Sequence, residues 1–444
     1  MANGSRGWDG HTLTRLEDVL AAEPCPVCAE ADGAAESWFA TYEHETNADP
    51  AMKMRMKDTL GLCTAHTRRL LDQTMSAGWL TAALFADVVP AGLRMLAAGH
   101  GPTAPCPPCT AAARRVDTVL GVLRAGLADS ARLRAAYEAG SGVCLPHLRP
   151  LVTGMRANTA APVVRRLVRT LEAGTGEALG GLAGFDPDQR RRARVTTVHR
   201  DAVLEAEERA VKTSTAAYVE LILATPACPL CTARERARWR LYDWLGTTPT
   251  PPEELRLDAA LCGAHLGDLA AAGWSAAADA LTRYNADRVL ADLRPAADRL
   301  AALPTGWRGA VRAPRRTVLR TLTATFRPIP CRACRVADLA ERDERALCAI
   351  VAGDRSRADE LAQAHGLCLR HGLALAADAR LPASWRDLLV TRLRLLGYEL
   401  DRAARQTPRD GRWRTRGSEL TAWRRAPTLL DGAVLGPRPP GGPA

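Results

Sequence analysis

The sequence predicts an all-α protein, and two observations lead to that expectation. Ala, Leu and Arg dominate the 444 residues and aromatic residues contribute 5% of them, a composition that favours helix nearly throughout. A pair of short motifs, Cys-x-x-Cys and Cys-x-x-His, also recurs four times, with helical patterns between its members. The length and a hydrophobic content of 47% suit a soluble protein with substantial cores.

The motif pairs are regularly spaced. In each copy a Cys-x-x-Cys motif is followed after 30 to 34 residues by a Cys-x-x-His motif. Together the copies use twelve of the thirteen cysteines and four of the nine histidines. The candidate ligands are, copy by copy, Cys25, Cys28, Cys63 and His66; Cys106, Cys109, Cys144 and His147; Cys228, Cys231, Cys262 and His265; and Cys331, Cys334, Cys368 and His371.

These residue types at this spacing indicate metal binding. Two ligands three residues apart lie on one helical turn and can bind one ion together. A second such pair completes a tetrahedron of three sulfurs and one nitrogen, a recognised structural zinc set. We therefore expect each Cys-x-x-Cys to share an ion with the Cys-x-x-His that follows it, so that every copy closes a helical hairpin. Zinc is the favoured metal, and a [4Fe-4S] cluster, which accepts the same residue types, is the alternative.

Helical segments are expected on both sides of the ligands. Between the motifs, Ala111–Leu127 and Ser130–Ala139 are predicted helices, and after a Cys-x-x-His motif the same holds for Arg68–Leu84 and Leu388–Ala404. Proline stands before or within most Cys-x-x-Cys motifs, which suits the first position of a helix. Each site then joins helix N-termini, whose exposed N–H groups and positive dipole end favour thiolate over thiol.

The four copies are of two kinds. The first and third share Ala-Gly-Trp after their Cys-x-x-His motifs, whereas the second and fourth end in Cys-Leu-x-His. This order indicates that a two-site unit has been duplicated. Gly and Pro residues near Phe185 mark the seam. The predicted division is an N-terminal half, 1–185, with the first two sites, a C-terminal half, 186–430, with the other two, and a disordered tail, 431–444.

Charge and hydropathy bear on partner and location. The formal net charge is +11, and Arg-rich surfaces attract phosphate, but acidic residues are interspersed with Arg outside the run Arg190–Arg194. Met1–His11 lacks the apolar core of a signal peptide, and Trp79–Leu96 is interrupted by charged residues and a proline. A cytoplasmic protein is expected. There the cysteines would be metal ligands, because that compartment keeps thiols reduced.

The same motifs carry a resemblance. Cys-Pro-x-Cys followed by Gly-Leu-Cys-x-x-His, at Gly61–His66 and Gly366–His371 and more loosely at Gly142–His147, resembles a family of uncharacterised bacterial helical proteins with these paired motifs. The resemblance covers most of the chain and implies metal binding, without implying a reaction. The third copy departs from the pattern, because Ala260 replaces the glycine and its interval is the shortest. A retuned or lost site is expected there first.

These observations predict a multi-site, zinc-binding helical scaffold or interaction protein whose partner is another protein. The alternative is an iron-sulfur redox protein or cluster-dependent enzyme with up to four [4Fe-4S] centres. Nucleic acid is the less favoured partner, and a membrane is not expected. The sequence contains no nucleophile elbow, no phosphate-binding Gly-rich loop before Lys-Ser/Thr and no His-Glu-x-x-His motif. No residue is therefore assigned a catalytic role.

Overall fold

The computed structural model describes residues 10–22, 25–73, 78–174, 215–247, 261–302, 331–405 and 417–432. These residues are helical apart from short connections, and no strand occurs among them. The all-α prediction is confirmed. The predicted seam near Phe185 lies outside the described residues, and so does the predicted tail, 431–444, except for Asp431 and Gly432 at the end of the last described helix. The division into two homologous halves stays a prediction.

Most of the helices are short, and a few exceed twenty residues. In chain order they are α1 (Gly10–Ala22), α2 (Pro26–Thr41), the π-helix η1 (Tyr42–Thr46), α3 (Pro50–Thr59), α4 (Thr64–Gln73), α5 (Gly78–Ala98), α6 (Pro107–Asp129), α7 (Ala131–Ala139), α8 (Leu145–Val152), α9 (Ala157–Ala173), α12 (Thr215–Ala224), α13 (Pro229–Thr247), α15 (Gly263–Ala271), α16 (Ser275–Ala301), α19 (Arg332–Gly353), the 3-10 helix η2 (Arg355–Arg357), α20 (Ala358–Gln363), α21 (Leu369–Ala377), α22 (Ala383–Arg405) and α23 (Glu419–Asp431).

The helices predicted beside the ligands are found. α6 and α22 contain the segments expected between and after the motifs and extend beyond them. α7 begins after Ser130, whose side-chain oxygen accepts a hydrogen bond of 3.2 Å from the Leu133 N–H and so caps the helix. Of the predicted helix Arg68–Leu84, residues 68–73 lie in α4 and residues 78–84 in α5, and residues 74–77 lie outside the described part.

The chain divides into two compact units, and neither is a continuous stretch of sequence. The first comprises residues 1–36, 111–191 and 245–332. The second comprises residues 37–110, 192–244 and 333–444. Each unit therefore draws on sequence from before and after Phe185. Neighbouring positions in the sequence are a poor guide to which segments pack together.

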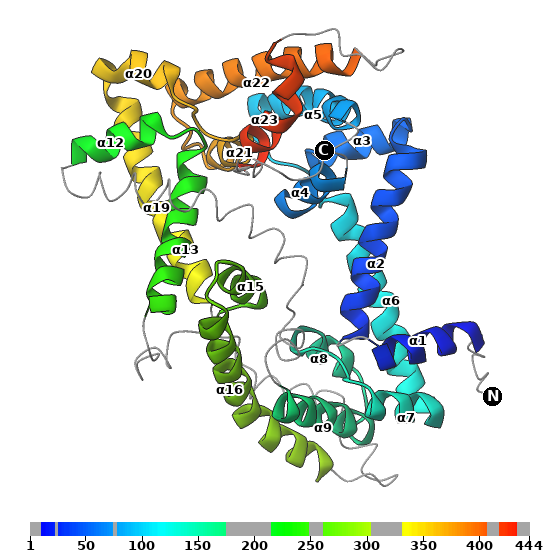
Figure 1. Ribbon diagram of the computed structural model, residues 1–444. Coiled ribbons are helices and arrows are strands. Elements are labelled where there is room, and N and C mark those ends of the chain that lie inside the picture. The colour runs from blue at the N-terminus through cyan, green and yellow to red at the C-terminus, as the bar shows by residue number, and fades with distance from the viewer. Residues whose placement is uncertain are drawn as a thin grey trace. The chain divides into compact units, whose positions relative to one another are not determined.

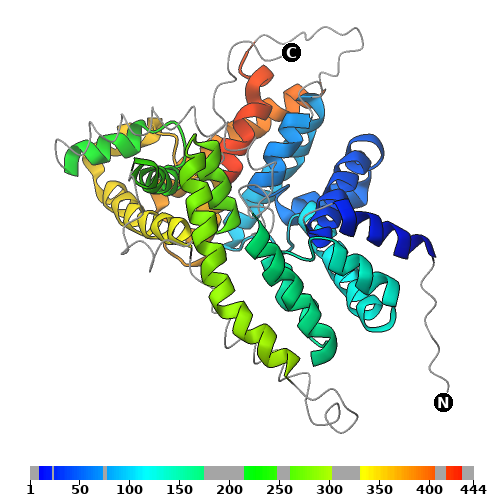
Figure 2. The same ribbon diagram turned by 60° about the horizontal axis from the view of Figure 1, so that its bottom comes forward.

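In the first unit, α9 and α16 lie side by side and supply much of the core (Figures 1 and 2). Val164 and Leu167 of α9 and Leu293 of α16 are completely buried. The apolar residues of α9 recur at helical spacing, so one face enters the core and the other stays polar. At the exposed edge, Arg294 of α16 pairs with Glu172 of α9 at 2.7 Å.

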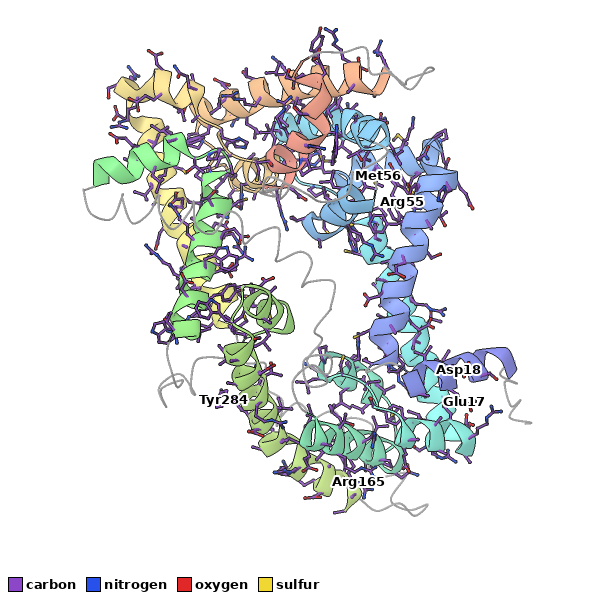
Figure 3. All side chains as sticks on the ribbon, viewed as in Figure 1. Glu17, Asp18, Arg55, Met56, Arg165 and Tyr284 are labelled. Carbon is purple, nitrogen blue, oxygen red and sulfur yellow. The ribbon has the colours of Figure 1, made fainter. Side chains whose placement is uncertain are left out.

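In the second unit, α5 and α22 lie side by side through the centre of the core (Figure 1). The close approach uses Gly397 of α22, where a Cβ atom would lie 3.2 Å from the Val89 side chain of α5. α3 also packs against α5. On α3, Met56 is buried in this core while its neighbour Arg55 is exposed (Figure 3).

One stretch of the described residues, Leu80–Ala98 in α5, is long and apolar enough to cross a membrane. Of this stretch, 61% is buried inside the protein, and Asp87 on it pairs with Lys57 of α3 at 3.2 Å. Asp87, Pro90 and Arg94, which we expected to make the segment too interrupted for a membrane span, lie within one helix that is apolar enough by length and composition. The burial and the ion pair are those of a core helix.

Candidate metal centres

The sixteen predicted ligands gather into four clusters of three cysteines and one histidine. Within each cluster the potential ligand atoms all lie within 4.8 Å of one another. The clusters are Cys25, Cys28, Cys144 and His147; Cys63, His66, Cys106 and Cys109; Cys228, Cys231, Cys368 and His371; and Cys262, His265, Cys331 and Cys334. The predicted composition of four Cys3His sets is thus confirmed.

The predicted partnership between motifs is wrong, however. No Cys-x-x-Cys motif shares a cluster with the Cys-x-x-His motif that follows it. The first Cys-x-x-Cys joins the second Cys-x-x-His, and the motifs between them join each other, so that one site is nested inside the other in sequence. The third and fourth copies repeat this nesting.

We name the sites by this order. The outer sites are those of Cys25 and of Cys228, the first ligand in each nested pair of sites, and the inner sites are those of Cys63 and of Cys262. The third copy, expected to be the irregular one, contributes to both C-terminal sites, and each has its full set of four ligands. No lost site is found in that region.

Every ligand motif lies at a helix N-terminus, as the sequence predicts. All eight motif helices begin one residue after the first cysteine of the motif. Cys144, Cys262 and Cys368 are N-cap residues with extended backbone, and the next turn of the helix donates its first hydrogen bond to their carbonyl oxygens. The second ligand of each motif then falls in the first helical turn. Two helix N-termini therefore meet at each site, and the exposed N–H groups of both favour thiolate over thiol.

A glycine-led turn positions the cysteine of three Cys-x-x-His motifs. Gly61, Gly142 and Gly366 have φ of 82°, 77° and 82°, a left-handed conformation that glycine adopts without strain. The residue between each glycine and the cysteine is buried, as Leu62 and Leu367 illustrate. The Gly-Leu-Cys pattern thus combines a backbone turn with an apolar anchor that fixes the ligand.

The separations between ligand atoms suit a single ion. Sulfur–sulfur distances are 3.6 Å for Cys28 and Cys144 and 3.8 Å for Cys231 and Cys368. Distances from sulfur to histidine Nδ1 range from 3.1 Å in the Cys262 site to 3.6 Å in the Cys25 site. Around a tetrahedral zinc ion, sulfurs stand about 3.8 Å apart and sulfur and nitrogen about 3.5 Å apart. The residues therefore fit zinc.

Outer and inner sites differ in burial. The four ligand cysteines that are buried, Cys25, Cys144, Cys228 and Cys368, all belong to outer sites. The two that are exposed, Cys109 and Cys262, belong to one inner site each. Solvent and competing ligands therefore reach the inner sites more readily. The sequence suggested that the first and third copies differ from the second and fourth. The difference in cysteine burial instead separates the outer sites from the inner sites.

Protons and metal compete for these ligands. Burial works against a charged His66, but hydrogen bonds with Cys109 and Cys63 outweigh it and raise the pKa of His66 to about 9. In the same cluster, hydrogen bonds from Cys106 and Cys109 lower the pKa of the Cys63 thiol. A cation must displace the proton that His66 holds below pH 9, so cation binding weakens as the pH falls.

The outer C-terminal site has a carboxylate behind its histidine. His371 directs Nδ1 to the sulfurs, while its Nε2 faces the Glu341 carboxylate at 3.6 Å. His371 and then Arg234, at 2.5 Å from the carboxylate, lower the pKa of Glu341 to about 2. A carboxylate behind a ligating imidazole fixes the ring and raises its basicity.

Ion pairs, one of them buried, join the helices that carry the Cys-x-x-Cys motifs. Arg236 of α13 pairs with Glu344 of α19 at 3.2 Å, and both side chains are almost completely buried. In the first unit, the Nε of Arg115 in α6 donates to Glu30 of α2 at 2.6 Å. These pairs could not be predicted from the sequence, because the paired residues are 108 and 85 positions apart and only the fold brings them together.

Within the described part of the chain, Cys348, His100 and His365 take no part in the clusters. Cys348 of α19 is buried, as expected of a cysteine without a motif, and burial raises its pKa. Phe39, one of the aromatic residues near the first Cys-x-x-Cys, lies in the core with its ring 5.7 Å from the His66 ring. The described part of the chain is therefore an all-α protein with four Cys3His clusters.

Compared with protein-family models, with curated proteins and with solved structures, the chain matches none of them. The resemblance to bacterial helical proteins rests on the motifs alone.

Proposed function

We propose that the chain is a zinc-binding helical scaffold in which four structural ions hold distant segments of sequence together. The observation that carries the proposal is the spacing of the ligand atoms, all within 4.8 Å in each cluster. One tetrahedral ion accounts for that spacing. In a [4Fe-4S] cluster each ligand binds a different iron, which sets the ligand atoms farther apart than around one ion.

A structural role follows from the ligand count. Catalytic zinc keeps an open position for water or substrate, whereas four protein ligands close the shell. Each Cys3His set supplies four. The proposed role of the ions is therefore to hold the helices in a fixed arrangement. The expected partner of such a scaffold is another protein.

The ligand positions suit this role. Cys28 and His147, which share the outer N-terminal site, are 119 residues apart, and Cys231 and His371 are 140 residues apart. An ion that bridges such positions closes a long loop and restricts the unfolded chain. The ions would thus stabilise the assembly of each unit more than any individual helix.

Metal analysis of the purified protein tests the identity of the metal. We expect a colourless protein with about four zinc ions per chain. Cys334→Ser should lower the zinc content by about one ion, whereas Cys348→Ser, which changes a cysteine outside the clusters, should leave it unchanged. About sixteen irons per chain and broad absorbance at about 400 nm would overturn the zinc assignment in favour of four [4Fe-4S] centres.

Hydrogen exchange tests the scaffold role separately. Removal of zinc should increase amide exchange together at the starts of α2 and α8, which the outer N-terminal site connects. The middle of α9 carries no ligand and serves as the internal control. If exchange at α2 and α8 is the same with and without zinc, the ions do not hold these segments and the scaffold proposal fails.

A further inference from the structure

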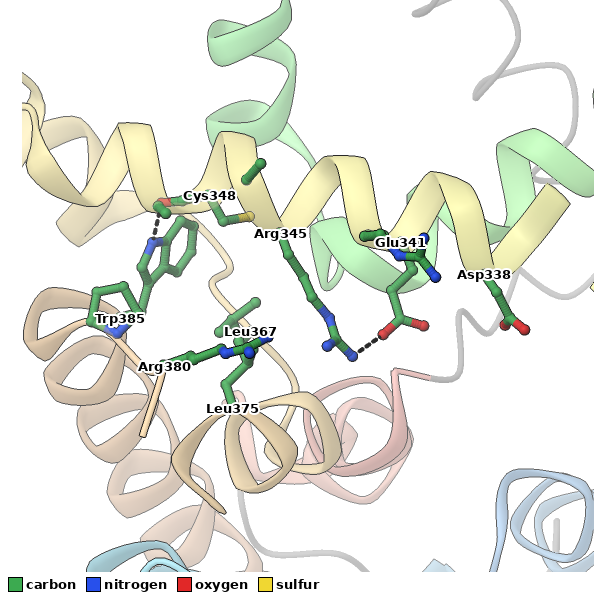
Figure 4. A pocket seen from close by; sticks show the side chains of 12 residues that line it. Asp338, Glu341, Arg345, Cys348, Leu367, Leu375, Arg380 and Trp385 are labelled. Atoms are coloured by element: carbon green, nitrogen blue, oxygen red, sulfur yellow. Dashed lines mark hydrogen bonds and ion pairs between the residues drawn. The ribbon is translucent and has the colours of Figure 1, made fainter. Parts of the chain in front are cut away.

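A cavity of about 760 Å³ lies in the second unit, beside α19 and the segment that connects α21 to α22. Its size is within the range of sites for small molecules, about 300 to 1,000 Å³. Figure 4 shows that Arg345 and Arg380 extend into the space between α19 and α21, with Trp385 at one end and Glu341 towards the other. None of the lining residues is a metal ligand.

The cavity carries unbalanced positive charge. Three arginines line it, and two of them, Arg342 and Arg380, have no side-chain hydrogen bond or ion pair with any described residue. Arg345 pairs with Glu341, but its Nε is buried without a hydrogen-bond partner. The two lining carboxylates, Asp338 and Glu341, are both bound by Arg234. With Arg234 included, four arginines face these two carboxylates, so an excess of positive charge remains.

The opposite part of the lining is apolar and rigid. Trp385 is completely buried, and its Nε1 donates a hydrogen bond of 2.9 Å to the Cys348 carbonyl oxygen. This bond fixes the indole and occupies its polar atom, so the buried ring supports the apolar wall from behind. Leu367, Leu375 and Pro382 complete this wall. A ligand that satisfies both parts has a charged end and an apolar body.

We propose that this cavity binds a small organic anion, with its carboxylate or phosphate group held by Arg342, Arg345 and Arg380 and its aromatic or branched body against the apolar wall at the Trp385 end. Guanidinium groups match the planar geometry of carboxylate and the oxygens of phosphate. A cation is excluded by the arginines. An inorganic anion alone leaves the apolar wall uncovered. The cavity contains none of the Cys3His residues, although its lining residue Glu341 also faces His371 of the outer C-terminal site.

Calorimetric titration of the full-length, metal-loaded protein tests this proposal with defined probes. The anions are naphthalene-2-carboxylate and 2-naphthyl phosphate, and naphthalene-2-carboxamide is the neutral counterpart of the carboxylate. Each anion should bind once per chain, and the amide at least about tenfold more weakly, because charge-assisted hydrogen bonds exceed neutral ones by that order. Both unpaired arginines are exposed residues, so Arg342→Ala with Arg380→Ala leaves the core intact. This double variant should lose at least about tenfold in anion affinity.

The matched control is Arg386→Ala with Arg394→Ala, the same change of charge at exposed positions of α22 that do not line the cavity. It should bind the anions as the unmodified protein does. Equal loss in both double variants would mean that the anions respond only to overall charge, and would overturn the proposal. Equal affinity for the amide and the carboxylate, or no heat of binding with either anion, would overturn it as well.

Discussion

Glu341 is the residue through which the outer C-terminal site meets its surroundings. It faces Nε2 of His371, and it also binds Arg234 at 2.5 Å and pairs with Arg345. His371, and after it the two arginines, hold the carboxylate ionised and lower the pKa of Glu341 to about 2. The imidazole is thereby oriented with Nδ1 towards the three sulfurs.

Substitution of this carboxylate should weaken the site without removing a ligand. We expect Glu341→Gln to lower the zinc affinity of the outer C-terminal site by about 10- to 100-fold, the usual effect of losing a partner of a ligating histidine. Competition with a chromophoric zinc chelator measures the affinity. Asp343→Asn, at an exposed position of the same helix, is the control. If the two variants retain zinc equally well, Glu341 does not support His371.

At this scale the sequence was informative. The sixteen residues of the four clusters could be predicted, because a cysteine or histidine pair three residues apart needs only one helical turn to converge. Glu341 could not be predicted as a partner of His371, since the two residues are thirty positions apart in sequence and several acidic residues of α19 are equally good candidates. Burial distinguishes Glu341 and Glu344 from Asp338 and Asp343, and burial depends on the fold.

At the scale of secondary-structure elements, α23 carries no residue of a Cys3His cluster, but its C-terminal end lies against one of the metal centres. Its helix ends at Gly432, whose φ of 69° is left-handed and whose N–H bonds back to Thr428. The backbone at Gly432 comes so close to the outer C-terminal site that an added Cβ would overlap the Cys231 sulfur and lie 3.3 Å from that of Cys368. The C-terminal helix thus covers this site and leaves room for glycine alone.

Gly432→Ala should therefore perturb the site from outside its ligand set. The left-handed backbone costs about 1 kcal/mol with any side chain, and the methyl group must displace either α23 or Cys231. We expect loss of zinc from this site and faster alkylation of Cys231, measured by mass spectrometry. Gly353→Ala, at the end of α19 where a methyl group meets open space, is the control. Unchanged alkylation of Cys231 would contradict the close approach.

The starts of the helices could be predicted because each depends on local chemistry. Proline after the first cysteine and exposed N–H groups beside thiolates belong to one turn of chain. The extent of α5 could not. Pro90 is a helix breaker by intrinsic propensity, yet packing against α22 and α3 retains the helix on both sides of it. The length of α5 therefore depends on tertiary contacts, which the local sequence does not show.

For the molecule as a whole, the nested partnership of the motifs, in which each Cys-x-x-Cys shares a site with a Cys-x-x-His other than the next one along the chain, is the central feature. The entropy of loop closure rises slowly with loop length, so a site that joins positions 119 apart is not much costlier than one that joins neighbours. Spacing along the chain therefore could not indicate which Cys-x-x-His completes a given Cys-x-x-Cys. Core packing settles the question, as the buried Cys25 and Cys144 illustrate.

Single cysteine substitutions distinguish the nested partnership from a sequential one, in which each Cys-x-x-Cys would bind its ion with the Cys-x-x-His that follows it. Cys144→Ser should release Cys25 and Cys28 to alkylation while Cys106 and Cys109 stay protected by their zinc. Sequential partnership would give the opposite pattern, with Cys106 and Cys109 released. Cys63→Ser is the reciprocal variant and should expose Cys106 and Cys109 alone. Peptide mapping after brief treatment with iodoacetamide reads both outcomes.

The difference in burial between the sites predicts the order in which the ions leave. A chelator reaches a zinc ion most easily where a ligand sulfur is exposed, as at Cys109 and Cys262 of the inner sites. The outer sites enclose buried sulfurs at Cys25 and Cys228 and must open before exchange. Treatment with excess chelator should therefore release about two ions in a fast phase and about two in a slow phase.

Alkylation assigns these phases to sites. Cys109 and Cys262 should be modified during the fast phase, and Cys25 and Cys228 only during the slow one. Cys348 is buried outside every cluster and should remain unmodified in both phases, unless the protein unfolds. One phase for all four ions, with all ligand cysteines modified together and Cys348 still protected, would show that nesting does not control access. The outer ions would then be no more secure than the inner ones, although their ligands are buried.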